Sequence, residues 1–182
     1  MGLPKHEHLP HYTYDDYKVW EGHWELINGI PYAMTPAPSV YHQEINGNLY
    51  AELRQALHPC RHCKVLLPVD WRITEDTIVQ PDLSVLCNST DTGAFITQVP
   101  AVVFEILSPA TANKDRTIKF ELYESQGVEY YVIINPQQKT AEVFRLFEGR
   151  YKKVKETTTD AVAFSLTEAA GCNFTVDFSQ IW

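Results

Sequence analysis

A strand–helix–strand unit between residues 102 and 134 constrains this chain more than any other feature of its sequence. Residues 102–107 read VVFEIL and residues 128–134 read VEYYVII, and runs this apolar are typical of strands buried on both faces of a sheet. The residues between them, about 112–126, have the pattern of a helix that ends at Gly127. Two strands joined through a crossover helix pair in parallel. This unit predicts an α/β fold.

The flanking segments add antiparallel hairpins and a second helix. Asn28-Gly29, within residues 24–34, is a strong signal for a two-residue hairpin turn. Ser39 is a suitable N-cap for a helix that extends to about His58. Further strands are expected in residues 65–73, in residues 78–87 and on both sides of Glu148-Gly149. The tail, residues 161–182, is expected to contain one short strand and to pack loosely. The expected architecture is a mixed central sheet with helices on its faces.

Length and composition are those of an ordinary globular protein. The chain has 182 residues, 45% of them hydrophobic, which is enough for one domain over residues 1–182. No apolar run approaches the roughly 18 residues needed to cross a bilayer, and the N-terminus lacks the apolar core of a signal peptide. We therefore expect a cytoplasmic protein whose four cysteines are reduced thiols. The Cys60-Arg-His-Cys63 segment indicates zinc only weakly, because a second matched pair is missing.

Two acidic residues and one lysine are the candidates for chemistry. Glu105 interrupts an apolar strand, and a buried carboxylate is costly unless it is paired or binds a metal. Asp82 follows Pro81, which cannot donate a ladder hydrogen bond and marks a sheet edge or a bulge. Lys119 lies beside the buried stripe of the next helix and can point back toward the Glu105 strand. The ordinary alternatives are a Glu held by an Arg, a solvated Asp, and a Lys paired with Asp115.

Together these residues resemble the motif of the PD-(D/E)XK nuclease superfamily, in which a Pro-Asp pair precedes an acidic residue in the next buried strand. The wider chain resembles the Uma-type restriction endonuclease family, also called domain of unknown function 820. The resemblance covers about residues 12–150 and is carried by WELINGIPYAMTPAPSVYHQ, VQPDLSVL and VVFEILSPATANKDRTIKFELYESQGVEYYVIINP. It implies a restriction-endonuclease-like fold. The lysine position of the motif holds Leu107, so the resemblance implies that Lys119 has taken over its role.

The first long helix supplies one more candidate. The superfamily often adds an acidic residue from this helix, and Glu44 is the candidate by residue type. Helical phase favours His42 instead: with Ile45 at 0°, His42 falls at about 60°, inside the apolar face, and Glu44 at about −100°. We therefore expect His42 to complete the site, with Glu44 as the second choice. The ordinary alternative is that His42 is a satisfied core residue.

The resemblance implies a Mg²⁺- or Mn²⁺-dependent endonuclease that hydrolyses phosphodiester bonds of DNA. Asp82 and Glu105 would hold the metal, since hard cations favour oxygen ligands. Lys119 would position the attacking water or stabilise charge on the phosphate. Two other functions stay open: a catalytically quiet binding or scaffold module that keeps the nuclease fold, and a nuclease directed at RNA.

The charge distribution bears on the partner. The formal net charge of −8 argues against a simple nucleic-acid binder, because neutralising phosphates requires Lys and Arg. Residues 139–155 nevertheless carry six basic side chains against two acidic ones, and such a basic ribbon could hold DNA. These six are Lys139, Arg145, Arg150, Lys152, Lys153 and Lys155. We expect the partner to be a nucleic acid, DNA rather than RNA, and we expect no membrane association. A homodimer is left open.

Overall fold

The computed structural model describes residues 10–34, 37–167 and 172–182. Its contacts group the chain into two compact units. Unit 1 comprises Met1–Ala37, Val69–Gln80 and Asp91–Thr97, and unit 2 comprises Pro38–Pro68, Pro81–Thr90 and Gln98–Trp182. One domain over residues 1–182 stays a prediction. No helix among the described residues is long and apolar enough to cross a membrane.

Unit 2 is built on a six-stranded mixed sheet, as expected. Its strands are β3 (Cys63–Leu66), β6 (Leu83–Cys87), β8 (Val102–Ile106), β9 (Tyr130–Asn135), β10 (Thr140–Phe147) and β11 (Arg150–Thr157). The strand order is β11-β10-β9-β8-β6-β3. The β8–β9 pair is parallel and the other pairs are antiparallel, which confirms the crossover predicted for residues 102–134.

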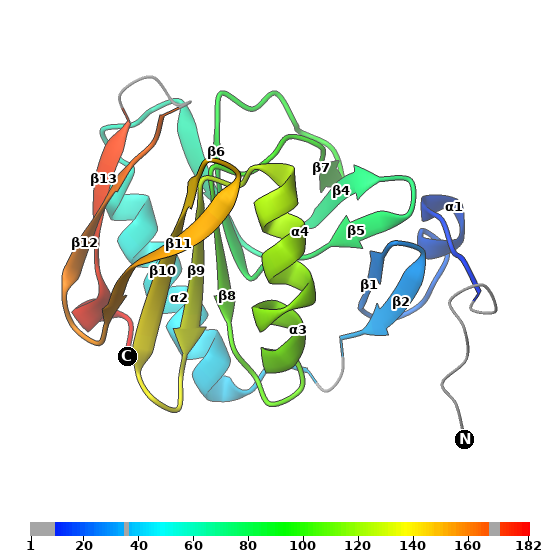
Figure 1. The fold of residues 1–182 in the computed structure, drawn as a ribbon, viewed down its shortest axis with the longest axis horizontal. Coiled ribbons are helices and arrows are strands. Elements are labelled where there is room, and N and C mark those ends of the chain that lie inside the picture. The colour runs from blue at the N-terminus through cyan, green and yellow to red at the C-terminus, as the bar shows by residue number, and fades with distance from the viewer. Residues whose placement is uncertain (1–9, 35–36, 168–171) are drawn as a thin grey trace. The chain divides into compact units, whose positions relative to one another are not determined.

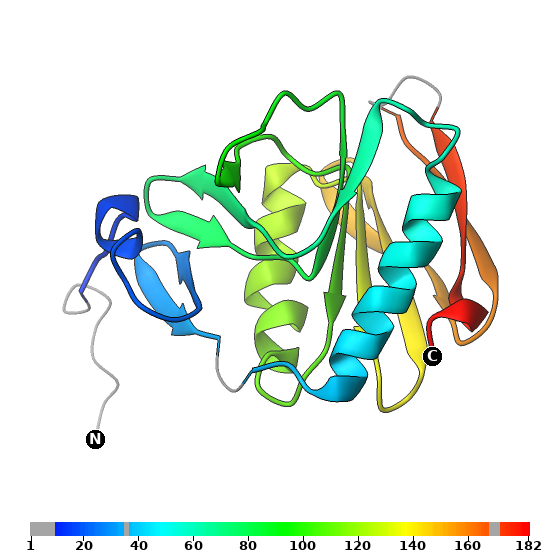
Figure 2. The same ribbon diagram turned by 180° about the vertical axis from the view of Figure 1, so that it is seen from behind.

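Helices cover both faces of this sheet (Figure 1). The helix α2 (Val40–Ala56) begins at Ser39, whose side chain accepts a hydrogen bond from the backbone N–H of His42. It buries Ile45, Leu49 and Leu53 against one face of the sheet. The view from behind shows α2 lying along this face (Figure 2). The opposite face carries α3 (Ala112–Arg116) and α4 (Ile118–Gln126), which replace the single helix expected over 112–126. They are separated at Thr117, whose backbone is not helical (φ −125°, ψ −81°).

The C-terminal segment packs more tightly than expected. Instead of one short strand it forms a hairpin of β12 (Ala161–Ser165) and β13 (Asn173–Asp177), followed by the 3₁₀ helix η2 (Phe178–Gln180). Apolar residues alternate along both strands, so one side of the hairpin faces the core. Phe164 and Phe178 are fully buried there. The prediction of a loosely packed tail is therefore wrong.

Unit 1 is built on a five-stranded sheet. Its elements are α1 (Tyr14–Tyr17), β1 (Trp24–Ile27), β2 (Ile30–Ala33), β4 (Asp70–Thr74), β5 (Thr77–Val79) and β7 (Phe95–Ile96). The strand order is β2-β1-β5-β4-β7. The predicted hairpin is confirmed: β1 and β2 are joined by Asn28 and Gly29, which both have positive φ (51° and 74°), as a tight hairpin turn requires.

Two expected strands are interrupted. Residues 65–73 and 78–87 were each predicted as one strand, but each run contributes one strand to the sheet of unit 1 and one to the sheet of unit 2. The interruptions contain Pro68 and Pro81. Proline has no N–H for the ladder, so each strand stops near it and the next begins with new partners.

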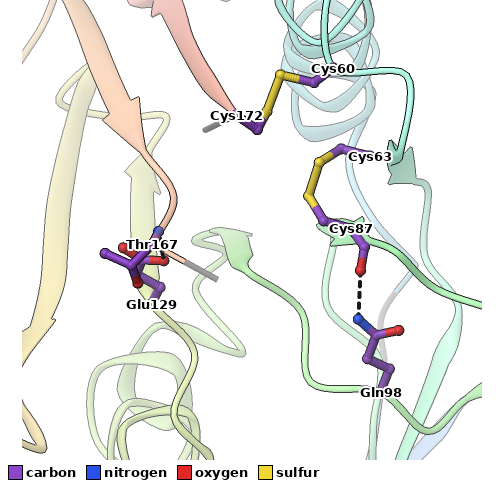
Figure 3. The surroundings of a disulfide bond; sticks show 7 residues. All are labelled: Cys60, Cys63, Cys87, Gln98, Glu129, Thr167 and Cys172. Atoms are coloured by element: carbon purple, nitrogen blue, oxygen red, sulfur yellow. Dashed lines mark hydrogen bonds between the residues drawn. A yellow bond between two sulfur atoms is a disulfide. The ribbon is translucent and has the colours of Figure 1, made fainter. Parts of the chain in front are cut away.

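All four cysteines form disulfides, so the expectation of reduced thiols is wrong (Figure 3). Cys63 and Cys87 are directly opposite each other on β3 and β6 and form one bond. Cys60 forms the other with Cys172, 112 positions away in sequence. The weakly indicated zinc site loses its thiolate ligands, because Cys60 and Cys63 are both oxidised.

The Cys60–Cys172 bond is expected to contribute most of the disulfide stabilisation. A crosslink restricts the unfolded chain more when it closes a longer loop, and bonds of this kind typically contribute about 2–4 kcal/mol. Replacing Cys60 and Cys172 together by Ala should lower the free energy of unfolding in urea by that amount. The matched control is the Cys63→Ala, Cys87→Ala pair, which opens a loop of only 24 positions and should cost less. Equal midpoints for wild type and the Cys60/Cys172 variant would contradict the prediction.

Candidate active site

Glu105 lies at the centre of the candidate site. It is on β8, is only 3% exposed, and faces α4 rather than the apolar core under α2. One carboxylate oxygen, Oε1, accepts hydrogen bonds from Lys119 Nζ and from Tyr123 Oη, both at 2.7 Å. The cost of burying this charge is thus offset by two donors from one helix.

Lys119 contacts two acidic side chains. It is 2% exposed, and its ammonium lies 2.7 Å from Glu105 and 3.9 Å from Oδ1 of Asp115, which is itself 1% exposed. Lys119 therefore pairs first with Glu105. The pairing with Asp115, given as the ordinary alternative, is the longer contact.

Asp115 and Tyr123 lie next to Glu105 and Lys119 in this cluster, although neither was predicted as a site residue. A usable signal existed, because Asp115, Lys119 and Tyr123 are spaced by four residues and such positions share one helix face. Each of these three positions holds a polar or amphipathic side chain, and the neighbouring apolar strand contains one Glu. This pattern predicts a buried polar cluster.

Asp82 reaches the same strand from another direction. It directly precedes β6, and its Oδ2 accepts a hydrogen bond of 2.8 Å from the backbone N–H of Ile106. Ile106 is the neighbour of Glu105 on β8. One peptide unit therefore links the Asp82 carboxylate to the strand position that carries Glu105.

His42 lies beside this link. Its Nε2 is 3.1 Å from the carbonyl oxygen of Ile106 and 3.4 Å from Oδ2 of Asp82. Its Nδ1 is buried and has no hydrogen-bond partner among the residues that the structure describes. Glu44 is exposed on the same helix. The structure thus brings His42, and not Glu44, next to Asp82, as helical phase indicated.

The surroundings of His42 change its pKa. Burial favours the neutral ring and lowers the pKa, but the hydrogen bond and charge of Asp82, the carbonyl of Ile106 and the charge of Asp115 together raise it above its ordinary value. A raised pKa stabilises the folded protein below the pKa of the unfolded state, and this contribution is lost as the pH rises through the folded pKa. Both the protonated ring and the neutral tautomer with its proton on Nε2 can donate to Asp82, and the protonated ring adds a charge attraction.

This pKa provides a test of the contact. In an NMR titration, His42 should titrate above the ordinary histidine range, and Asp82→Asn should move the midpoint down. His42→Gln should remove the corresponding loss of stability at rising pH. A midpoint for His42 below the ordinary histidine pKa of about 6.5 would contradict the prediction.

The donor set suits a hard divalent cation. Carboxylates of Asp82 and Glu105 and the carbonyl of Ile106 are oxygen ligands, and Mg²⁺ is usually held by one or two carboxylates together with water. Within residues 10–34, 37–167 and 172–182 no group of three or more His, Cys, Asp or Glu side chains forms a complete metal cage. The oxygen groups that could serve as ligands are thus the carboxylates of Asp82 and Glu105 and the carbonyl of Ile106.

Comparisons with known proteins bear on the family and the fold of this chain. The family model Uma2, described as "Putative restriction endonuclease", matches residues 14–177. Among solved structures, the chain is similar to the "Crystal structure of a putative nuclease belonging to DUF820" from Anabaena variabilis, with a TM-score of 0.71. The two are 18% identical, over 93% of this chain and 96% of that one, so the likeness shows the fold. A comparison with curated proteins finds no match.

Proposed function

Since this chain belongs to the Uma2 restriction endonuclease family, we propose that it is a divalent-metal-dependent endonuclease that hydrolyses phosphodiester bonds of DNA. One observation carries the proposal: the carboxylate of Asp82 is bound by the peptide N–H that directly follows Glu105 in the chain. The Ile106 N–H binds Asp82, and the adjacent Glu105 is held by Lys119. A structural ion pair alone would not require the second carboxylate at this place.

Asp82 and Glu105 would hold Mg²⁺ or Mn²⁺, with the Ile106 carbonyl as a further oxygen ligand. When bound, such a cation polarises the scissile phosphate and lowers the pKa of a coordinated water. The protein supplies the orientation of the two carboxylates. Asp82 is held by the backbone of β8, and Glu105 by the side chains of α4.

Lys119 would act mainly through Glu105. Its ammonium is fully buried and donates directly to the carboxylate, which keeps Glu105 ionised and in one orientation. The same positive charge would stabilise the negative charge that develops on the phosphate oxygens. This assignment gives Lys119 the role of the motif lysine, whose usual position is occupied by Leu107.

His42 would be a positioning residue. Its ring lies against both Asp82 and the Ile106 carbonyl, so it limits the orientations of two of the oxygen ligands. Because Nδ1 has no partner among the described residues, only one side of the ring is anchored.

The basic ribbon proposed for DNA is largely neutralised. Four of its six basic side chains form ion pairs: Arg145 with Glu129, Arg150 with Glu124, Lys153 with Glu142 and Glu156, and Lys155 with Asp160. Phosphates would have to compete with these acids, so the hairpin offers fewer contacts than its six basic side chains suggest. The binding surface for DNA and a homodimer stay predictions.

Cleavage assays test the proposal directly. Supercoiled plasmid, single-stranded DNA and RNA are incubated with the protein and Mg²⁺, Mn²⁺ or EDTA. We expect plasmid nicking with either cation, none with EDTA, and none with Glu105→Gln. Metal-dependent cleavage of RNA alone would favour the RNA-directed nuclease. Absence of cleavage on all three substrates, from a protein that is folded by circular dichroism, would favour the quiet scaffold module.

A further inference from the structure

Unit 1 contains a pocket that the proposed active site does not use. Its volume is about 300 Å³, at the lower end of the range for small-molecule sites. Five half-buried aromatic side chains line it: Tyr14, Tyr17, Trp20, Trp24 and Phe95. So many partly exposed rings around one hollow are unusual for a purely structural cluster, because rings that only fill a core become buried.

Most of the ring pairs around this pocket meet at steep angles. Trp20 lies edge-to-face with Tyr17 and with Trp24, with ring centroids 5.7 Å apart in both pairs. Tyr14 and Phe95 form a similar pair at 5.5 Å. Tyr14 is stacked with Tyr17 at 6.4 Å, and the Arg72 guanidinium lies 4.0 Å from the Tyr14 ring centroid. An edge-to-face contact covers one face of one ring only, so the half-buried Trp20 and Trp24 keep ring surface for a flat ligand.

One side of the pocket is polar, because Asp70 and Gln80 offer hydrogen-bond acceptors there. Asp70 accepts hydrogen bonds from the Tyr17 hydroxyl and from Gln80 Nε2, both at 3.0 Å. Burial and the charge of Asp70 raise the pKa of Tyr17, so this phenol stays a donor. A carboxylate has about four acceptor positions, and the carbonyl oxygen of Gln80 adds another. A ligand donor therefore finds acceptors on both residues.

We propose that this pocket binds a nucleobase carrying an exocyclic amino group. Aromatic rings stack on any base, and an amino group matches the acceptors of Asp70 and Gln80. Lys18 also lines the pocket, but its ammonium is paired with Asp15 at 2.6 Å, so a phosphate attached to the base would have to compete with this carboxylate. The inference goes beyond the proposed cleavage, because all its residues belong to unit 1 and binding requires no metal.

Calorimetry in EDTA separates this site from the nuclease centre. The full chain is titrated with CMP and AMP, with TMP, with choline, and with single-stranded oligo-dC and duplex DNA. We expect saturable binding of CMP or AMP, about tenfold weaker binding of TMP, and quenching of tryptophan fluorescence. Binding of mononucleotides would identify a free nucleotide as the source, and binding of oligo-dC alone would identify an unpaired base in a strand.

Variants locate the binding. Trp20→Ala should weaken CMP or oligo-dC about tenfold or more, as loss of a stacking ring does. Asp70→Asn, which replaces an acceptor by a donor, should reduce the preference for CMP over TMP. The matched control is Phe147→Ala, an exposed ring on β10 in unit 2. If Asp70→Asn does not fold, Gln80→Ala provides the same test.

Three results would overturn the inference. They are the absence of binding by CMP, AMP and oligo-dC, unchanged affinity in folded Trp20→Ala, and binding of choline as tightly as CMP. The last would make the pocket a cation site. Inactivity of the protein as a nuclease would not affect any of these measurements.

Discussion

Asp82→Asn and Glu105→Gln are each expected to abolish Mn²⁺ binding and to reduce cleavage by about 10³-fold. A bound cation contributes several kcal/mol of transition-state stabilisation, and each 1.36 kcal/mol corresponds to a factor of ten in rate. Both substitutions remove the ionised oxygens while keeping side-chain shape. Asn can still accept the hydrogen bond from Ile106, so the local backbone should be preserved.

Calorimetric titration with Mn²⁺ is the primary measurement, since it does not depend on finding the correct substrate. Glu44→Gln is the matched control: it removes an acidic charge from the exposed side of α2 and should bind and cleave like wild type. Equal Mn²⁺ affinity in wild type, Asp82→Asn and Glu105→Gln would eliminate the shared metal site, even if all three proteins were inactive on the DNA tested.

Lys119→Met is expected to lower the free energy of unfolding by about 3–5 kcal/mol and to eliminate cleavage. Lys119 is the cation that pairs with buried Glu105, and removing one partner of a buried ion pair leaves an uncompensated charge. Met retains most of the side-chain volume, so the loss reports on charge rather than on a cavity. Urea unfolding gives the stability, and the plasmid assay gives the activity.

A double-mutant cycle separates charge from packing. Glu105→Gln combined with Lys119→Met removes both charges of the closer pair and leaves the buried carboxylate of Asp115 in place, so part of the lost stability should be recovered. The double variant should therefore be more stable than Lys119→Met alone. A loss below about 1 kcal/mol in Lys119→Met, or normal cleavage by this variant, would remove Lys119 from the proposed role. Leu107→Lys in the Lys119→Met background tests whether the motif position can restore activity.

Local sequence patterns predicted the elements that depend on neighbouring residues. The hairpin at Asn28-Gly29 requires two residues with positive φ, and the start of α2 requires a capping side chain at Ser39. The parallel β8–β9 pair follows from strand length and a crossover helix. Helical phase alone also placed His42 on the buried face of α2 and Glu44 on the exposed face.

The sequence determined these features because each depends on interactions within a few residues or on the regular spacing of apolar residues along one helix or strand. Only the tertiary structure decided which distant groups meet. Asp82 binds the N–H of Ile106, 24 positions away, and Cys60 bonds to Cys172 across 112 positions. Residues 65–73 and 78–87 read as continuous strands, yet their partners lie in two sheets. Such pairings depend on the register and packing of segments that are remote in sequence, which no local pattern encodes.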